Sequence, residues 1–203
     1  MSSKWFKFST GWVRYGGMTG FKGGRYAGES LAALKCLVAL SRSADFNSRI
    51  ATASLSDLQD ATGLSRPMVI KGIRSLEKDG FILRNEESHV GTYLIDLQTW
   101  TTDDYWTKLP YDMVGKALPS LPNRGSGALA ALKIYIYLAS IRPNREEAIY
   151  AKYETIRQHT NIQQKHVRVG LDLLIEHHLL RVSRTNEDGK LRRNEYQIIG
   201  LRL

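Results

Sequence analysis

The chain has 203 residues and a formal net charge of +9 at pH 7, with 42% hydrophobic and 24% charged residues. That length can bury one or two sizeable cores. Because the apolar stretches are short, we expect neither a secretory leader nor a membrane span. The excess of cations favours nucleic acid as a partner. A single cysteine, Cys36, cannot form an internal disulfide, so we expect a cytoplasmic, nucleoid-associated protein.

The first 28 residues are basic and rich in glycine and aromatic side chains, and they contain no acidic residue. Such a segment suits an arm that follows a phosphate backbone or enters a minor groove of DNA. The alternative, which we favour, is a short strand or patch in which Trp5, Phe8 and Trp12 pack on the first domain. If the segment is an arm, its DNA contacts are its cations, which are Lys4, Lys7, Arg14, Lys22 and Arg25.

The segment LAALK occurs at residues 31–35 and again at residues 129–133, an offset of 98 positions. The same offset, without a gap, pairs many apolar or small residues with a residue of the same kind, among them Gly72 with Gly170. These pairs recur three or four residues apart, as the buried face of a helix requires. The sequence therefore predicts two copies of one domain. The predicted units are an arm at residues 1–28, domains at residues 29–98 and 127–203, and a partly packed linker at residues 99–126.

Each copy is predicted to contain three helices followed by a hairpin. In the first copy, a helix over residues 29–43 precedes a second helix that begins at Ser54, where Asp57 three residues later completes a capping pattern. The second helix is expected to end at Gly63, because glycine readily adopts the left-handed conformation that closes a helix. Asn161, the next best residue for that conformation, occupies the matching position in the second copy.

The third helix and the hairpin complete the copy. Ser65 is the expected N-cap of a helix that carries Val69 and Ile73 on its apolar face. Two β-rich runs at residues 81–84 and 92–95 flank a polar tip, which is the pattern of a β-hairpin. In the linker, Trp106 and the next three residues repeat the W-x-K-(F/L) pattern of residues 5–8, so the repeat extends upstream of each domain.

Helix, helix, short turn, helix and hairpin is the order of a winged helix-turn-helix domain. Residues 55–82, LSDLQDATGLSRPMVIKGIRSLEKDGFI, resemble that family in the T-G-L-S turn and the closing L-E-x-x-G-(F/L)-I. Residues 156–180 resemble it less closely, because His178 replaces the glycine of the closing motif. The tandem arrangement looks like that of plasmid and phage replication initiators. The resemblance implies a mainly helical α+β fold with two tandem winged helix-turn-helix domains, and double-stranded DNA as the partner.

The outward residues of the third helix in each copy are the candidate base readers, because an α-helix fits the major groove and Arg, Lys and Gln can pair with purine edges there. With the apolar residues inward, the first copy turns outward Arg66, Met68, Lys71 and Arg74. The second copy turns outward Gln163, Gln164, Lys165, His166 and Arg168. The alternative interpretation is that both sets are ordinary solvated polar faces.

The hairpins, or wings, supply candidate phosphate contacts, for which cations matter more than shape. The first wing contributes Arg84, whereas the second contributes Arg184, Lys190, Arg192 and Arg193. The second wing is therefore the expected clamp, although a charged loop that only keeps the protein soluble has the same composition.

No Cys-x-x-Cys or His-Glu-x-x-His motif is present, so we predict no enzyme, metal site or cofactor. We expect a sequence-selective protein that binds double-stranded DNA at an origin or operator, resembling a replication initiator; the alternative is a winged-helix repressor. A tandem winged-helix scaffold of the chromosome-condensation type is less favoured, because such scaffolds tend to be acidic whereas residues 1–100 carry +4 and the rest +5. Replication or transcription machinery and a second copy of the chain are compatible further partners.

Overall fold

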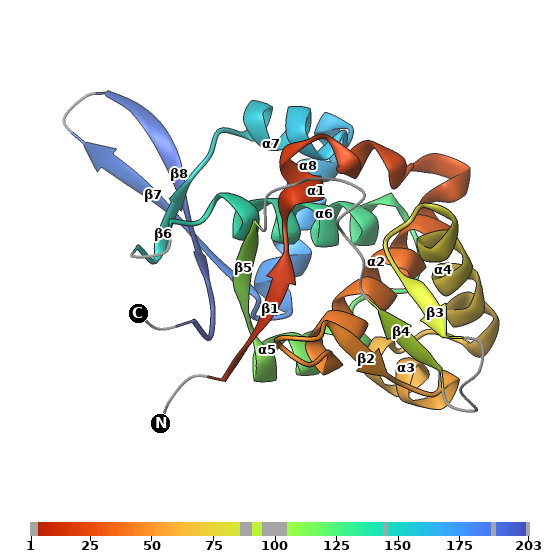
Figure 1. The fold of residues 1–203 in the computed structure, drawn as a ribbon. Coiled ribbons are helices and arrows are strands. Elements are labelled where there is room, and N and C mark those ends of the chain that lie inside the picture. Colours follow the sequence, from red (N-terminus) through yellow and green to blue (C-terminus); the bar gives the residue numbers. More distant parts are fainter. Residues whose placement is uncertain (1–3, 86–90, 95–104, 144–145, 188–189, 202–203) are drawn as a thin grey trace.

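The computed structural model describes residues 4–85, 91–94, 105–143, 146–187 and 190–201 (Figure 1). The fold belongs to the α+β class and is mainly helical with small antiparallel sheets, which confirms the class expected from the sequence. Buried apolar side chains of both halves form one continuous hydrophobic core. Within the described ranges, no helix has the length and apolar character needed to cross a membrane.

The first half contains a strand, a short helix and two 3-10 turns before its three longer helices. In chain order its elements are β1 (Trp5–Ser9), α1 (Gly11–Arg14), η1 (Gly17–Gly20), η2 (Gly24–Tyr26), α2 (Ala27–Ser43), β2 (Ile50–Thr52), α3 (Leu55–Thr62), α4 (Arg66–Lys78), β3 (Leu83–Asn85) and β4 (Thr92–Leu94).

The second half repeats this order of helices and strands. Its elements are β5 (Trp106–Pro110), α5 (Tyr111–Ser120), α6 (Ser126–Ile141), β6 (Ala148–Tyr150), α7 (Tyr153–Thr160), α8 (Gln164–Glu176), β7 (Leu180–Glu187) and β8 (Lys190–Ile198). The repeat therefore includes the strand that carries the W-x-K pattern in each half, as the sequence indicated. Two segments that we assigned to an arm and a linker contain β1, α1, β5 and α5.

The helix boundaries follow from the local signals in the sequence. Ser54 and Asp57 form a reciprocal capping box at the start of α3, with Asp57 N–H donating to the Ser54 hydroxyl over 3.1 Å. Gly63 closes α3 with a φ of 69°, and Asn161 closes α7 with a φ of 51°. His178 adopts the left-handed conformation, with a φ of 55°, at the position of Gly80. The second copy therefore keeps these turns despite the loss of both glycines.

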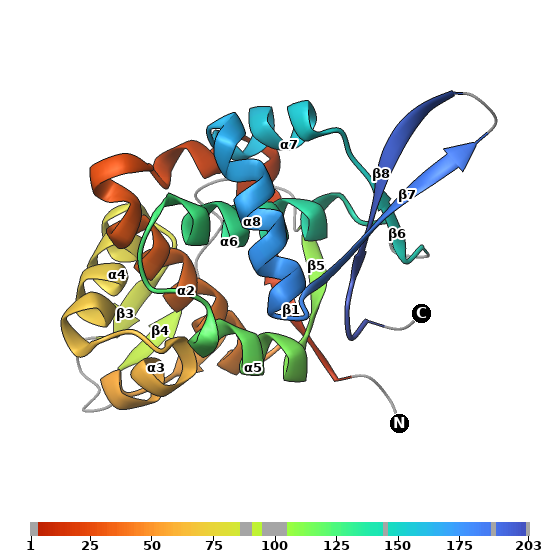
Figure 2. The same ribbon diagram turned by 180° about the vertical axis from the view of Figure 1, so that it is seen from behind.

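Each half also contains a three-stranded antiparallel sheet, in the order β2-β4-β3 in the first half and β6-β8-β7 in the second. The two hairpins were expected, but the strands β2 and β6 that border them were not. Tyr93 pairs with Ala51 in the first sheet, and Tyr196 pairs with Ile149 in the second, so the register is the same in both. Figures 1 and 2 show that the β7–β8 hairpin extends away from the body of the molecule.

The two halves are joined by a shared sheet and by contact between their central helices, so they are not separate units. Strand β1 pairs antiparallel with β5, and the register places Lys7 opposite Lys108 at the centre of the pair. These two lysines are equivalent in the repeat, so the sheet is symmetric about them. Helices α2 and α6, the two copies of the LAALK helix, cross at the middle of the molecule (Figures 1 and 2).

Two buried lysines also connect the halves, because each donates a hydrogen bond to the other half. Lys35 of α2 donates from Nζ to the Leu121 carbonyl of the other half over 2.8 Å, and Lys133 of α6 donates to the Phe21 carbonyl of the first half over 2.9 Å. Lys35 has two further acceptors, the Thr62 carbonyl at 2.9 Å and Oδ1 of Asn123 at 2.6 Å. Crossed contacts between equivalent positions are what an approximate two-fold relation between the halves produces.

Candidate nucleic-acid interface

Helix α4 is seated by a close contact with α2. A Cβ atom added at Gly72 would lie 2.8 Å from the carbonyl carbon and oxygen of Ala32, so only glycine lets the two backbones approach this closely. Gly170 of α8 has the same role against Ala130 and Ala131 of α6. The offset of 98 therefore conserves the positions that set the orientation of the third helix in each half.

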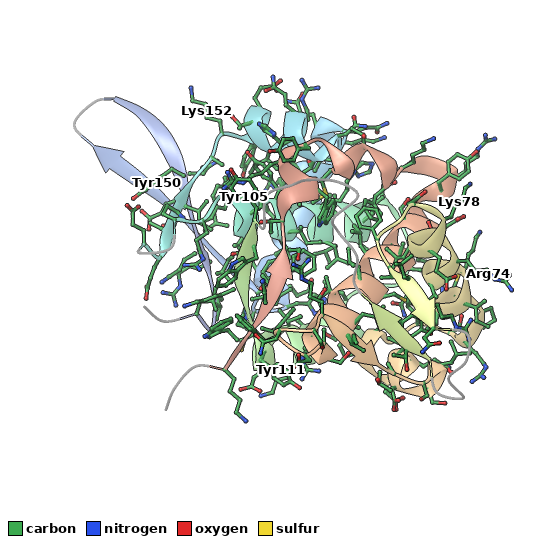
Figure 3. All side chains as sticks on the ribbon, viewed as in Figure 1. Arg74, Lys78, Tyr105, Tyr111, Tyr150 and Lys152 are labelled. Atoms are coloured by element: carbon green, nitrogen blue, oxygen red, sulfur yellow. The ribbon has the colours of Figure 1, made fainter. Side chains whose placement is uncertain are left out.

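The outward face of α4 is strongly basic. Val69, Ile73 and Leu76 are buried, as expected, while Arg66 and Arg74 are exposed. Figure 3 shows Arg74 and Lys78 at the outer flank of the molecule, where they project from α4 into solvent. We did not predict Lys78, although it lies four residues after Arg74 and therefore on the same face of the helix.

Two other predicted contacts of α4 are partly engaged within the protein. Nζ of Lys71 lies 3.1 Å from Oε2 of Glu29 on α2, although the Lys71 side chain remains more than half exposed. Met68 is half-buried against the hydrophobic core, so it does not stand clear of the surface as the predicted base readers would. The exposed cations of α4 are consequently better placed than Met68 to contact an external ligand.

Helix α8 turns a different set of side chains to solvent. Gln163, Gln164, Lys165 and Arg168 are exposed, and His166 is half-buried. Arg168 forms an ion pair with Asp172, whose Oδ2 lies 3.8 Å from Nε, and both side chains are well exposed. Helix α8 also exposes two apolar side chains, Val169 and Ile175.

The charge on the two helices therefore differs. Helix α4 carries four basic residues and one acidic residue, whereas α8 carries two of each. At equivalent positions, Arg74 corresponds to Asp172 and Lys71 corresponds to Val169. A polyanion would be attracted to the outer face of α4 more strongly than to that of α8.

The wing residues lie on the paired strands, but only part of them is described. Arg84 is exposed on β3 and its backbone is paired with Tyr93 of β4. In the second wing, strands β7 and β8 include the four predicted cations, and the side chains of these residues lie outside the described part of the structure. They are Arg184, Lys190, Arg192 and Arg193.

The predicted cations of the first 28 residues do not lie along one extended arm. Their backbone is folded into β1, α1 and the 3-10 turns, and β1 is the short strand that we favoured. The Arg14 guanidinium lies 4.4 Å from the ring centre of Tyr105, and that of Arg25 lies 4.8 Å from the ring centre of Tyr26. Lys4 and Lys22 are exposed, and Lys7 on β1 is half-buried.

The single thiol is not a candidate nucleophile. Cys36 is fully buried in α2, and burial raises the pKa of its thiol to about 12, so the thiolate is scarce at neutral pH. Within the described ranges, no cluster of three or more His, Cys, Asp or Glu side chains is arranged to hold a metal ion.

The comparisons with known proteins supply no further assignment. No protein-family model and no curated protein matches this sequence. The interpretation of the surface therefore depends on its residues and their geometry.

Proposed function

We propose that this protein is a sequence-selective double-stranded DNA-binding protein of the tandem winged helix-turn-helix type, with α4 as its principal reading helix. The observation that carries the proposal is the outward face of α4, where Lys71, Arg74 and Lys78 lie on one side of the helix and the exposed Arg66 lies at its first turn, directly after a tight turn. A helix of this kind fits the major groove, and its arginines can donate to guanine O6 and N7.

The second reading helix in this proposal is α8, which contacts bases through Gln164 and Arg168. Glutamine can pair with adenine N6 and N7, so the neutral outer face of α8 suits base recognition better than attraction to phosphates. The crossed contacts between the halves support an approximate two-fold relation between α4 and α8. One chain is therefore expected to protect two unlike half-sites in inverted orientation, about one helical turn apart.

The proposed biological role is action at an origin or operator, in keeping with the resemblance to tandem winged-helix replication initiators. A repressor uses the same groove chemistry. A footprint on the DNA that flanks the gene separates the two roles: a row of repeated sites supports an initiator, and one site over a promoter supports a repressor.

Titration of duplex DNA with single-residue variants tests the proposal. Arg74→Ala is expected to weaken binding to the footprinted site by about 1–3 kcal/mol and to relax discrimination at one base pair, because a base contact is lost. The control is Lys116→Ala, which removes an exposed cation from α5, a helix that carries none of the proposed base contacts. Equal affinity of the wild-type chain for the site and for scrambled duplex would contradict sequence-selective reading.

A further inference from the structure

The β1–β5 sheet has one face in the core and one face toward solvent. Its inward residues, Phe6, Phe8 and Leu109, are buried, because side chains alternate across a strand. The outward residues include Trp5 and Lys7 on β1, and at the equivalent positions of β5 they include Trp106 and Lys108. The crossing of the two halves thereby brings two tryptophans and two lysines to one small surface.

Three exposed aromatic side chains on this surface contact one another. Trp5 and Trp106 stack with ring centres 5.9 Å apart and 16° between their planes. Phe46, from the loop after α2, meets both rings edge-on, at 5.9 Å from Trp5 and 6.2 Å from Trp106. The exposed fractions are 37% for Trp5, 38% for Trp106 and 49% for Phe46. Three large aromatic side chains gathered in this way mark a site of interaction.

Cations surround the aromatic cluster. Nζ of Lys7 lies 5.4 Å from the ring centre of Trp106, and Nζ of Lys108 lies 4.8 Å from that of Trp5. This symmetric arrangement keeps positive charge beside the ring faces. The surface is therefore both aromatic and cationic. This combination suits a polymer that has planar bases and an anionic backbone.

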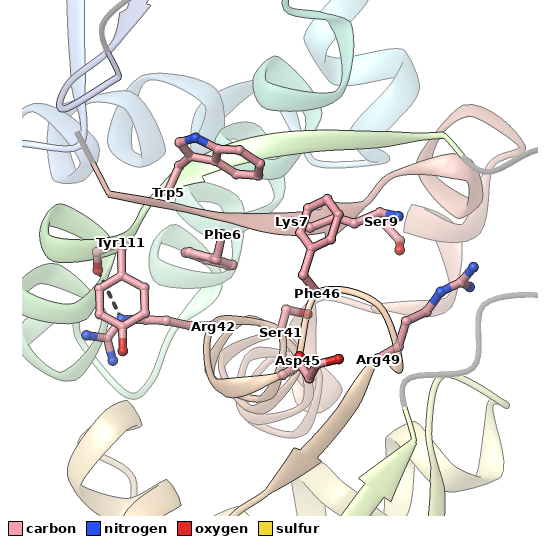
Figure 4. Close-up of a pocket in the computed structure, with 11 residues that line it drawn as sticks. Trp5, Phe6, Lys7, Ser9, Ser41, Arg42, Asp45, Phe46, Arg49 and Tyr111 are labelled. Carbon is pink, nitrogen blue, oxygen red and sulfur yellow. Dashed lines mark hydrogen bonds between the residues drawn. The ribbon is translucent and has the colours of Figure 1, made fainter. Parts of the chain in front are cut away.

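A cavity of about 220 Å³ opens beside Trp5 and Phe46 (Figure 4). Its other lining residues include Arg42 and Arg49, and among the described lining residues the one carboxylate is that of Asp45. That carboxylate accepts hydrogen bonds from the backbone N–H groups of Asn47 and Ser48 and from the Ser48 hydroxyl, and these bonds hold its pKa below the usual value. Asp45 thus shapes the loop, and the cavity retains an excess of positive charge.

We propose that the outer face of the β1–β5 sheet, with the cavity beside it, binds single-stranded nucleic acid. Lys108 and Lys7 lie over the ring faces of Trp5 and Trp106, so a base that stacks on either tryptophan displaces the ammonium group, which then pairs with a phosphate. A duplex does not suit this surface, because its base faces are already stacked on each other. The site goes beyond the proposed duplex binding, and it lies on the sheet between the halves, whereas α4 lies at the outer flank (Figures 1 and 2).

Binding of a fluorescein-labelled 20-residue oligothymidylate, followed by anisotropy at low salt, tests the proposal. Oligothymidylate forms no duplex, so it lacks the major groove that α4 is proposed to read. Trp5→Leu and Trp106→Leu are each expected to weaken its binding about tenfold, and the wild-type chain is expected to show quenching of tryptophan fluorescence on saturation. The matched control is Tyr153→Leu, which removes an exposed aromatic side chain from α7 and is expected to leave the affinity unchanged.

A second pair of variants separates this proposal from the proposed function. Arg66→Ala with Arg74→Ala is expected to weaken duplex binding while oligothymidylate binding is retained, and Lys7→Gln with Lys108→Gln is expected to give a shallower salt dependence for oligothymidylate only. These glutamine variants leave the aromatic cluster and the core in place, so they report on binding if the leucine variants unfold. No binding of oligothymidylate by the wild-type chain, or equal binding by all variants, would overturn the proposal. So would self-association of the wild-type chain that is lost in Trp106→Leu, since the face would then be covered by a second copy.

Discussion

Helices α4 and α8 are copies of one another in the core and differ at the surface. Their buried residues match at the offset of 98, and both carry a glycine against the backbone of the LAALK helix. Their outward residues do not match, since Arg74 corresponds to Asp172 and Lys78 to Glu176. Packing restricts the volume and shape of a buried side chain, whereas an exposed position tolerates any polar residue. The repeated architecture is therefore retained while the surface of each half is suited to a different contact.

The largest expected effect concerns the two buried lysines, which are equivalent in the repeat but not in their partners. Lys35→Met removes the donor for three acceptors, and Lys133→Met removes it for one. The Thr62 and Leu121 carbonyls are buried, whereas Asn123 is exposed and can bond to water. At about 1.5 kcal/mol for each buried carbonyl left without a donor, we expect losses of about 3 and about 1.5 kcal/mol in the free energy of unfolding. Urea denaturation measures both, with Lys116→Met as the exposed control. Equal losses would show that the number of buried acceptors does not set the contribution of each lysine to stability.

The next effect concerns the charge difference between the reading helices. Arg74→Asp places on α4 the residue found at the equivalent position of α8, and it is expected to weaken duplex binding by about 2 kcal/mol through loss of a cation and gain of an anion. The reciprocal change, Asp172→Arg, is expected to strengthen binding to any duplex by about 1 kcal/mol. Titrations at several salt concentrations measure both variants. If the two changes had the same sign, the two faces could not lie on the same polyanion.

The third effect is the pH dependence that burial imposes on Lys133. Burial lowers the pKa of its ammonium group from 10.5 to about 8, so the folded chain loses this proton before the unfolded chain does. Between about pH 8 and 10.5 the unfolded chain binds more protons, and the contribution of Lys133 to stability rises with pH, by at most about 1.4 kcal/mol per pH unit. The difference in unfolding free energy between the wild-type chain and Lys133→Met should therefore grow over this range. A constant difference would contradict it.

The smallest expected effect concerns a buried hydroxyl present in one half only. Tyr135 of α6 is fully buried, its hydroxyl has no hydrogen-bond partner among the described residues, and Leu37 occupies the equivalent position of α2. Tyr135→Phe removes this unsatisfied group and is expected to raise the free energy of unfolding by about 1 kcal/mol. Thermal and urea denaturation check the gain, with Tyr153→Phe on the surface as the control. A loss of stability would indicate that the hydroxyl is hydrated in the folded protein.

Helix starts and helix ends were predictable because their signals are local. The capping box at Ser54, the left-handed residues at Gly63 and Asn161, and the spacing of apolar residues each act within one or two turns of helix. The strands β2 and β6 were missed because each has only three residues and no neighbouring run that marks a hairpin. Strands β3 and β4 are equally short, but they flank a polar tip that indicates their pairing. Met68 was assigned to the outward face from its position in the helix, but the long side chain packs back against the core.

By itself, the sequence determined the two copies, their helices and the net basic charge, since these depend on composition and on contacts between near neighbours. The tertiary structure decided that the two halves share a sheet and contact each other through it. The pairing of β1 with β5 joins residues about 100 positions apart, and the W-x-K pattern in each strand does not specify its partner. The tertiary structure also decided which tryptophans are buried: Trp12 on α1 lies in the core, whereas Trp5 and Trp106 lie on the solvent side of the sheet. Their exposure follows from which face the core covers, a property of the assembled fold.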